Sequence, residues 1–241
     1  MKDLTCVIQA RIGGGKRLPG KMIIPFAESC LFEILLNKLL LCKNLEKTQI
    51  YLSLCEKELI KIAEKYDFNI YHRDPKSIDE SNIDDPISHM RNVFSWVYDI
   101  ESDYFLQLNA CNPLLSVKTI DRAIDYFQNN NIKSLFSVTK RNNYYWNKNG
   151  DMLSNYQGPK TQTEYFYHFG TQWVEPVYEA AHSIYIFNNE YFMRNNMHRF
   201  SLTKNDPYLF EMPSDEAFDI DYQWQFELAE SLYLNKKDKN I

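Results

Sequence analysis

The chain has 241 residues, of which 44% are hydrophobic and 24% charged, with a formal net charge of -5. This is the composition of a soluble globular protein, and its negative charge argues against nucleic-acid binding, which needs a basic surface. Because no apolar run reaches the roughly 20 residues of a membrane helix and the start, MKDLTCVIQAR, has no signal-peptide core, we expect a cytoplasmic protein without membrane contact.

The first 140 residues alternate short apolar runs with helical patterns. Strands are expected at residues 4–10, 49–54, 68–71, 104–108 and 133–139, and helices at 29–42, 56–66, 86–98 and 117–129. The helix at 29–42 would take Ser29 as its N-cap. The alternation predicts an α/β fold with a doubly wound, mainly parallel sheet and helices on both faces. Ligands of such sheets bind at the carboxyl ends of the strands, here the loops after Ala10 and Leu108.

Residues 141–180 interrupt this alternation with a polar and aromatic stretch. We consider two interpretations: a flap or dimerisation arm inserted within a single domain of residues 1–241, or a loop that covers the acceptor. The apolar run at 180–187 predicts a further strand, and residues 209–212 a short one. A last helix is expected to begin at Asp221 or Tyr222.

A glycine-rich basic loop follows the first predicted strand. Four of the seven glycines fall within eight positions, interleaved with basic residues: Arg11, Gly13, Gly14, Gly15, Lys16, Arg17, Gly20 and Lys21. Glycine lets the backbone approach a ligand closely, and successive N–H groups form an anion-binding nest. The pattern is neither a P-loop nor a dinucleotide fingerprint. It favours a polyphosphate site over a solvated basic turn.

An acidic pair, Asp219 and Asp221, precedes the last predicted helix. In extended chain, residues two apart point to the same side. Mg²⁺ prefers a few carboxylates together with phosphate oxygens and water. The alternative is a helix N-cap with a neighbouring surface acid. Together with the phosphate loop, the pair predicts Mg²⁺ as the cofactor.

Three segments resemble one known family. IQARIGGGKRLPGKMI and LFEMPSDEAFDIDYQWQFELAE resemble signature segments of the CMP-sialic acid and CMP-Kdo synthetase family of cytidylyltransferases, including its spore-coat polysaccharide synthesis branch. LNACNPLLSVKTIDRAI resembles a middle segment less closely. The resemblance runs from residue 4 to about residue 230 and implies a Rossmann-like nucleotidyltransferase fold and a homodimer. Cys111 stands where the Kdo branch carries an Asp.

The resemblance also implies roles for individual residues. Arg11, Lys21, Asp219 and Asp221 match catalytic positions, the two aspartates as Mg²⁺ ligands. Nucleotide binding is expected from Ala10, Arg11, Gly13, Gly14, Gly15, Lys16, Arg17, Lys21, Arg73 and Asn109. Acceptor binding is expected from Asn109, Gln172, Glu179, His182 and Tyr185. His182 is also a candidate general base, because histidine titrates near neutral pH.

The expected reaction moves CMP from CTP to a small acidic acceptor and releases pyrophosphate. The acceptor would be a nonulosonic or related acid, a precursor of capsule, lipopolysaccharide or another surface polysaccharide. A small phosphorylated or phosphonate acceptor stays open. A glycosyltransferase also uses a D-x-D pair on a metal, but its pair usually lies mid-chain, whereas Asp219 is near the end. A non-catalytic nucleotide-sensing subunit is the third alternative.

Overall fold

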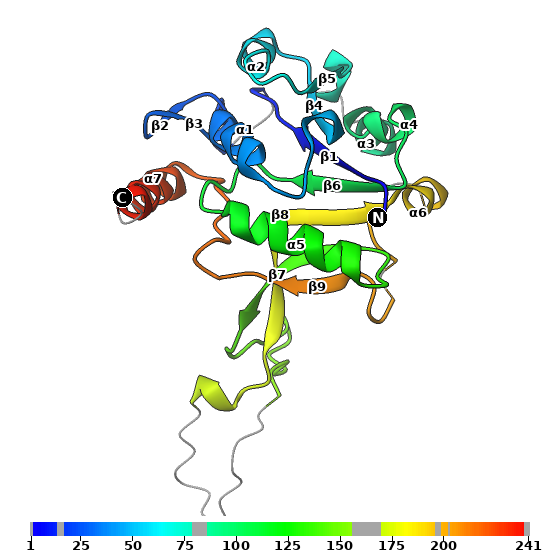
Figure 1. Ribbon diagram of the computed structural model, residues 1–241. Coiled ribbons are helices and arrows are strands. Elements are labelled where there is room, and N and C mark those ends of the chain that lie inside the picture. The colour runs from blue at the N-terminus through cyan, green and yellow to red at the C-terminus, as the bar shows by residue number, and fades with distance from the viewer. Residues whose placement is uncertain are drawn as a thin grey trace, which may run out of the picture.

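The computed structural model describes residues 2–13, 17–78, 86–155, 170–195, 199–201 and 203–238. The strands of its main sheet are β1 (Leu4–Gln9), β4 (Ile50–Leu54), β5 (Asn69–His72), β6 (Tyr104–Leu108), β7 (Leu135–Arg141), β8 (Val177–Asn188) and β9 (Tyr208–Glu211). Their order across the sheet is β5-β4-β1-β6-β8-β7-β9 (Figure 1). A two-residue hairpin, β2 (Pro25–Phe26) with β3 (Ser29–Cys30), stands apart from the sheet.

Strand direction confirms the predicted mainly parallel sheet. β1 runs parallel to β4 and β6, β4 runs parallel to β5, and β7 runs parallel to β9. β8 is antiparallel to both of its neighbours, β6 and β7. β8 follows the arm and runs back beside β7, and an antiparallel return of this kind needs no crossover helix.

The helices are α1 (Leu31–Leu41), α2 (Lys57–Ala63), α3 (Pro86–Val93), α4 (Trp96–Asp99), α5 (Val117–Asn129), α6 (Asn189–Arg194) and α7 (Gln223–Asp238). Short 3₁₀ turns occupy Lys47–Gln49, Pro75–Ser77 and Thr171–Trp173. The helix expected at 86–98 is two helices, α3 and α4. Phe94 and Trp96, both buried, lie at the break, and residues two apart point to different sides of a continuous helix. The break lets both rings reach one core, where their centroids are 5.8 Å apart.

The N-cap predicted for α1 is wrong by one residue. Cys30 is the N-cap, and it makes no side-chain capping bond. Ser29 lies in β3, and its hydroxyl instead donates to the Glu33 carboxylate at 2.9 Å. The start of α5 is capped in the ordinary way, since the Ser116 hydroxyl accepts the Thr119 N–H at 3.1 Å.

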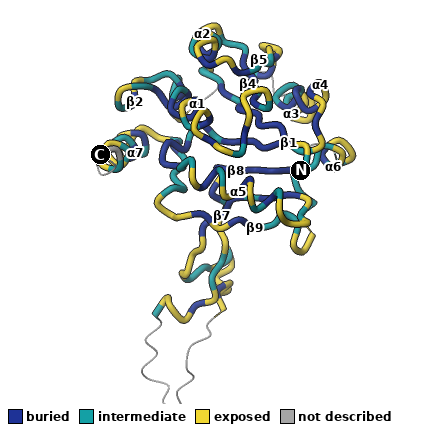
Figure 2. The backbone as a smooth tube through the Cα atoms, in the orientation of Figure 1, coloured by how far each residue is buried: buried dark blue, intermediate teal, exposed yellow. Residues whose placement is uncertain are grey.

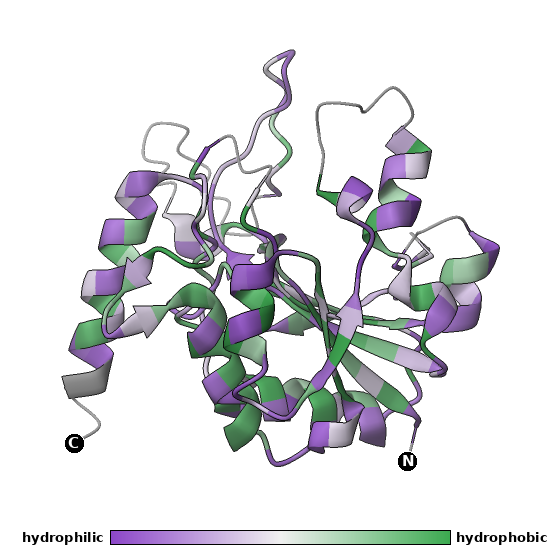
Figure 3. Ribbon diagram, turned by 90° about the horizontal axis from the view of Figure 1, so that it is seen from above, coloured by the Kyte–Doolittle hydropathy of each residue, from purple (hydrophilic) through white to green (hydrophobic). Residues whose placement is uncertain are grey.

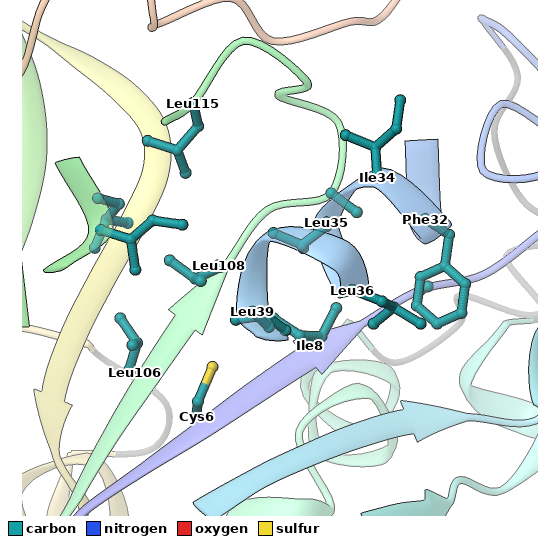
Figure 4. Packing of buried hydrophobic residues seen from close by; sticks show 14 of the residues in the cluster. Cys6, Ile8, Phe32, Ile34, Leu35, Leu36, Leu39, Leu106, Leu108 and Leu115 are labelled. Carbon is teal, nitrogen blue, oxygen red and sulfur yellow. The ribbon is translucent and has the colours of Figure 1, made fainter. Parts of the chain in front are cut away.

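Two hydrophobic cores, one on each face, confirm the doubly wound arrangement. Alternate residues of β1 point to opposite faces: Cys6 and Ile8 belong to the core beneath α1, α5 and α7, while Val7 joins Trp96 and Phe105 on the other face. Figure 4 shows α1 packed over β1 and β6 in the first core. Both hydrophobic and hydrophilic colours alternate along the covering helices (Figure 3), as expected where one side of each helix faces the sheet.

The segment between β7 and β8 projects from the sheet as an arm, and its described parts are largely exposed (Figure 2). A short antiparallel bridge joins Trp146 to Met152. Trp146, Met152, Leu153 and Trp173 are large apolar side chains on its surface. The arm lies within the expected insertion at 141–180, and its role as a flap or dimerisation element stays a prediction. Within the described ranges, no helix has both the length and the apolar character to span a bilayer.

Candidate active site

The loop after β1 is closed at its base and anchored by buried side chains. The Gly20 N–H bonds the Ile12 carbonyl at 3.2 Å, and Gly20 has φ +70°, a conformation that favours glycine. Leu18 and Met22 are buried beneath the loop. Of the predicted phosphate-binding residues, Gly14, Gly15 and Lys16 lie outside the described residues, whereas Gly13, Arg17 and Lys21 are within them.

The basic loop and the acidic pair meet, although about 200 positions separate them in the sequence. The Lys21 ammonium donates to the Ile220 carbonyl at 2.6 Å and lies 3.4 Å from Asp221 Oδ1. The Arg17 guanidinium lies 2.6 Å from Asp221 Oδ2. Both cations therefore act on one carboxylate, which belongs to a residue two positions before the start of α7.

The helix-cap alternative for the acidic pair is not what the contacts show. The Gln225 side-chain oxygen accepts the N–H groups of Asp221 and Tyr222 at 2.7 and 2.9 Å. Gln225 thus holds the two residues that precede α7, as the third helix residue does in a capping box. The Asp221 carboxylate is directed instead at Arg17 and Lys21.

Asp219 lies deeper than Asp221 and is held by the loop that follows β6. The Asn109 amide donates to Asp219 Oδ1 at 3.4 Å, and the Ile220 N–H bonds the Cys111 carbonyl at 3.0 Å. Burial raises the pKa of Asp219, and the nearby Asp221 charge raises it further, while Lys21 acts in the opposite direction. A cation between the two carboxylates would relieve both the desolvation and the repulsion.

The donor chemistry of the site fits a hard cation. Within the described ranges, no three His, Cys, Asp or Glu side chains form a metal-binding group. Two carboxylates suit Mg²⁺, which completes its shell with phosphate oxygens and water. Burial raises the pKa of the Cys111 thiol to about 11, so this side chain is protonated at neutral pH and is a poor metal ligand.

A cavity of about 340 Å³ opens beside the first residues of the loop. It is lined by Gln9, Ala10, Arg11, Arg73, Ser77, His89, Met90 and Val93. Arg73 is 5% exposed and donates to the Ala10 carbonyl at 2.9 Å. Within the described part of the chain, Arg73 Nε and the Ser77 hydroxyl are buried without hydrogen-bond partners. Buried polar groups are normally bonded, so these two unsatisfied atoms distinguish the residues that line this cavity.

Three of the predicted acceptor residues gather on the other side of the acidic pair. His182 lies at a bulge of β8 with φ +51°, where the pairing with β7 shifts register. Its Nδ1 is 2.9 Å from the buried Tyr185 hydroxyl, and burial raises the pKa of Tyr185. The Asn109 N–H bonds the Ser183 carbonyl at 3.1 Å. The bulge therefore brings His182 and Tyr185 beside Asn109 and Asp219.

The two other predicted acceptor residues lie in the arm and at its base, Gln172 in the arm and Glu179 near the start of β8. Gln172 lies in the 3₁₀ turn Thr171–Trp173, and the exposed Glu179 pairs with Arg141 at 2.7 Å. The structure does not bring them to the cluster around Asp219 within one chain, and their role stays a prediction. A larger hollow of about 1350 Å³ runs along β9 and contains none of the predicted site residues.

Sequence reasoning missed several residues at the site. Ser77, in the turn DPKS, carries no local signal, because its importance depends on burial beside a distant loop. His89 and Met90 line the same cavity and resemble ordinary helix residues in the sequence.

Comparisons with known proteins agree with this geometry. A family model described as cytidylyltransferase matches residues 5–240. Post-translational flagellin modification protein B of Campylobacter coli is 28% identical over 250 residues, covering 100% of this chain and 98% of that protein.

Solved structures share the fold at low sequence identity. A CMP:2-keto-3-deoxy-manno-octonic acid synthetase complexed with CTP gives a TM-score of 0.62 at 11% identity, covering 98% of this chain and 100% of that one. A 4-diphosphocytidyl-2C-methyl-D-erythritol synthase from Anaerococcus prevotii gives 0.62 at 15% identity, covering 97% and 99%. Since the family model spans nearly the whole chain, the chain belongs to the cytidylyltransferase family and is a CTP-dependent nucleotidyltransferase.

Proposed function

We propose that this cytidylyltransferase transfers CMP from CTP to a small acidic sugar in the cytoplasm and releases pyrophosphate. The observation that carries the proposal is the meeting of Arg17, Lys21 and Asp221 within 2.6–3.4 Å. A cationic loop and a carboxylate pair at one point are what a metal–triphosphate complex requires. The family match favours this reaction over glycosyl transfer and over a non-catalytic role.

The nucleotide would lie along the loop after β1. Its base fits the cavity beside Ala10, whose lining includes the polar residues Gln9, Arg73 and Ser77. Its phosphates fit the cationic side, with Arg11, Arg17 and Lys21 as the neutralising side chains. Such a reaction is catalysed chiefly by positioning and charge neutralisation.

Mg²⁺ would be held by Asp219 and Asp221. When bound, it supplies neutralisation of charge on the reacting phosphate. The chain's own residues bind and orient: Lys21 and Arg11 stabilise negative charge as the acceptor oxygen bonds to the α-phosphorus and the bond to pyrophosphate breaks. Asp221 already pairs with Arg17 and Lys21. On binding, the metal would take the place of these cations at Asp221, and the triphosphate would take the place of Asp221 at Arg17 and Lys21.

The acceptor is proposed to be a nonulosonic or related acid. Two observations support an acidic sugar: the full-length relative is named for flagellin modification, and one structural neighbour is named for an octonic acid. Asn109, His182 and Tyr185 lie where the acceptor would meet the α-phosphate, next to Asp219. A small phosphorylated acceptor is the second candidate, because another structural neighbour carries the name of an erythritol derivative.

The working enzyme is proposed to be a homodimer held by the arm. Trp146, Leu153 and Trp173 are exposed apolar side chains on it, at 58%, 62% and 43%. Large apolar side chains exposed on one segment are typical of interaction sites. Gln172 lies in the arm and Glu179 near the start of β8 at its base, so a dimer is the arrangement in which they would reach an acceptor site.

Purified protein should be tested against a matrix of nucleoside triphosphates and acceptors with Mg²⁺, scored by pyrophosphate release. We expect release with CTP and a nonulosonic or octulosonic acid, and little with ATP, GTP or UTP. Equal release with UTP, or release only with a phosphorylated acceptor, would contradict the proposed substrates. Light scattering after gel filtration gives the oligomeric state, and a monomer would refute the dimer.

A further inference from the structure

The first residues of the loop after β1 are held from the side of β4. Glu56 Oε1 accepts the Ile12 N–H at 2.7 Å and the Gly13 N–H at 3.4 Å. The second carboxylate oxygen accepts the Cys55 thiol at 3.2 Å. One carboxylate therefore bonds two successive backbone amides at the start of a glycine-rich loop, although 44 positions separate Ile12 from Glu56.

Glu56 is not acting as a helix cap. It is the N-cap residue of α2, the position where a side-chain oxygen normally accepts a helix N–H, yet it makes no side-chain capping bond. Its carboxylate is turned from its own helix toward the loop. The acidic side chain in the first turn of α2 is Glu58, which is exposed.

Contacts at consecutive positions fix the base of the loop. The Ala10 carbonyl accepts from Arg73 at 2.9 Å, the Ile12 N–H is held by Glu56, and the Ile12 carbonyl accepts the Gly20 N–H at 3.2 Å. Both backbone polar groups of Ile12 are thus used to close the loop. Arg73 also lies near enough to Glu56 for their charges to interact. The positive charge of Arg73 therefore stabilises the Glu56 carboxylate beside the loop.

Glu56 acts on the side of the loop away from the acidic pair. In the sheet, β1 lies between β4 and β6. Glu56 follows β4, whereas Asp221 is tied to β6 through the Ile220 bond to the Cys111 carbonyl. The loop is therefore held by an anion on one side, and its cations Arg17 and Lys21 project to the other.

We propose that Glu56 is a positioning residue that fixes the start of the glycine-basic loop from the β4 side so that Arg17 and Lys21 face the triphosphate. The inference rests on the proposed nucleotide site. Without Glu56, the loop must be ordered by the nucleotide itself, and the entropy cost of that ordering reduces affinity.

The test compares Glu56→Ala, Glu56→Gln and the matched control Glu58→Ala, an acid two residues on in the same helix. Calorimetric titration with CTP and Mg²⁺ should show at least about tenfold weaker binding for Glu56→Ala, as expected for losing a bond to a charged group. Glu56→Gln keeps an oxygen that accepts the Ile12 N–H, so most of the affinity should be retained. Glu58→Ala should match wild type.

Amide hydrogen exchange of peptides covering residues 4–22 is the second readout, and it needs no nucleotide. Glu56→Ala should speed exchange at Ile12 and Gly13 while the melting temperature changes little. Unchanged exchange and unchanged CTP affinity would overturn the proposal. Tighter CTP binding in Glu56→Ala would also overturn it, because Glu56 would then occupy the place of a phosphate. If wild type binds no CTP, the proposed function fails, and exchange alone decides whether Glu56 holds the loop.

Discussion

Replacing Lys21 by alanine removes the cation at the centre of the candidate site. The Lys21 side chain is 20% exposed and lies 3.4 Å from Asp221 Oδ1. Its ammonium also donates to the Ile220 carbonyl at 2.6 Å. The substitution therefore deletes one positive charge facing the proposed triphosphate and one bond that fixes the acidic segment.

The lost charge should lower the reaction rate, and the lost hydrogen bond should lower the stability of the fold. Removing one preorganised group that stabilises developing charge typically costs about 2.7–4 kcal/mol, or roughly 100- to 1000-fold in rate. Removing a hydrogen bond to a charged group costs about 1.5–3 kcal/mol of stability. Because domains are stable by about 5–15 kcal/mol, Lys21→Ala should remain folded while its turnover falls at least about 100-fold.

Pyrophosphate release under saturating CTP measures the rate, and thermal melting checks that the variant is folded. Lys47→Ala is the control, since this lysine is 54% exposed and lies 3.9 Å from Asp67, an exposed pair worth about 0–1 kcal/mol. Turnover by folded Lys21→Ala within about tenfold of wild type would refute the assigned role.

Three further predictions concern Asp221, Lys38 and the arm. Asp221→Asn should lower turnover at least about 100-fold without unfolding the chain, and near-normal release would contradict its role. Burial lowers the pKa of Lys38 to about 8. Above that pH the unfolded chain binds a proton that the folded chain lacks, so the free energy of unfolding should rise between about pH 8 and 10. Urea unfolding of Lys38→Met across this range should show a flatter rise, and equal slopes would count against the burial effect. Trp146→Ser with Leu153→Ser should shift the protein toward monomer in light scattering, and an unchanged mass would exclude the arm as the interface.

Much of the fold was predictable because each central strand is buried on both faces. Residues 4–9 and 104–108 are mostly apolar and almost wholly buried, and turn residues bound them, so composition and length identify them. The helix at 117–129 was predicted with its observed bounds, because an amphipathic pattern and a capping Ser116 agree.

Features that depend on distant contacts were not predictable. The break between α3 and α4 depends on a shared core for Phe94 and Trp96, and the reversal of β8 depends on how the arm returns. The bulge at His182 arises where β8 leaves β6 and continues along β7 alone. The local sequence pattern carries no information about the helix break, the strand reversal or the bulge.

Some residues of the candidate site could also be predicted from the sequence, and others could not. Residue type and local spacing single out Lys21, Asp219 and Asp221, because glycine with basic residues and paired acids are unusual combinations. Glu56 gains its importance from neighbours 43 and 44 positions away in the sequence. Ser77 gains its importance from burial. In the sequence they look like ordinary helix-start and turn residues.

A crystal structure with a non-hydrolysable CTP analogue and Mn²⁺ in place of Mg²⁺ tests the central claim most directly, since Mn²⁺ is located by its anomalous signal. The account predicts an anomalous peak about 2.1 Å from carboxylate oxygens of both Asp219 and Asp221, with the triphosphate between that ion and Lys21. A triphosphate bound elsewhere, or a metal peak away from both aspartates, would contradict it.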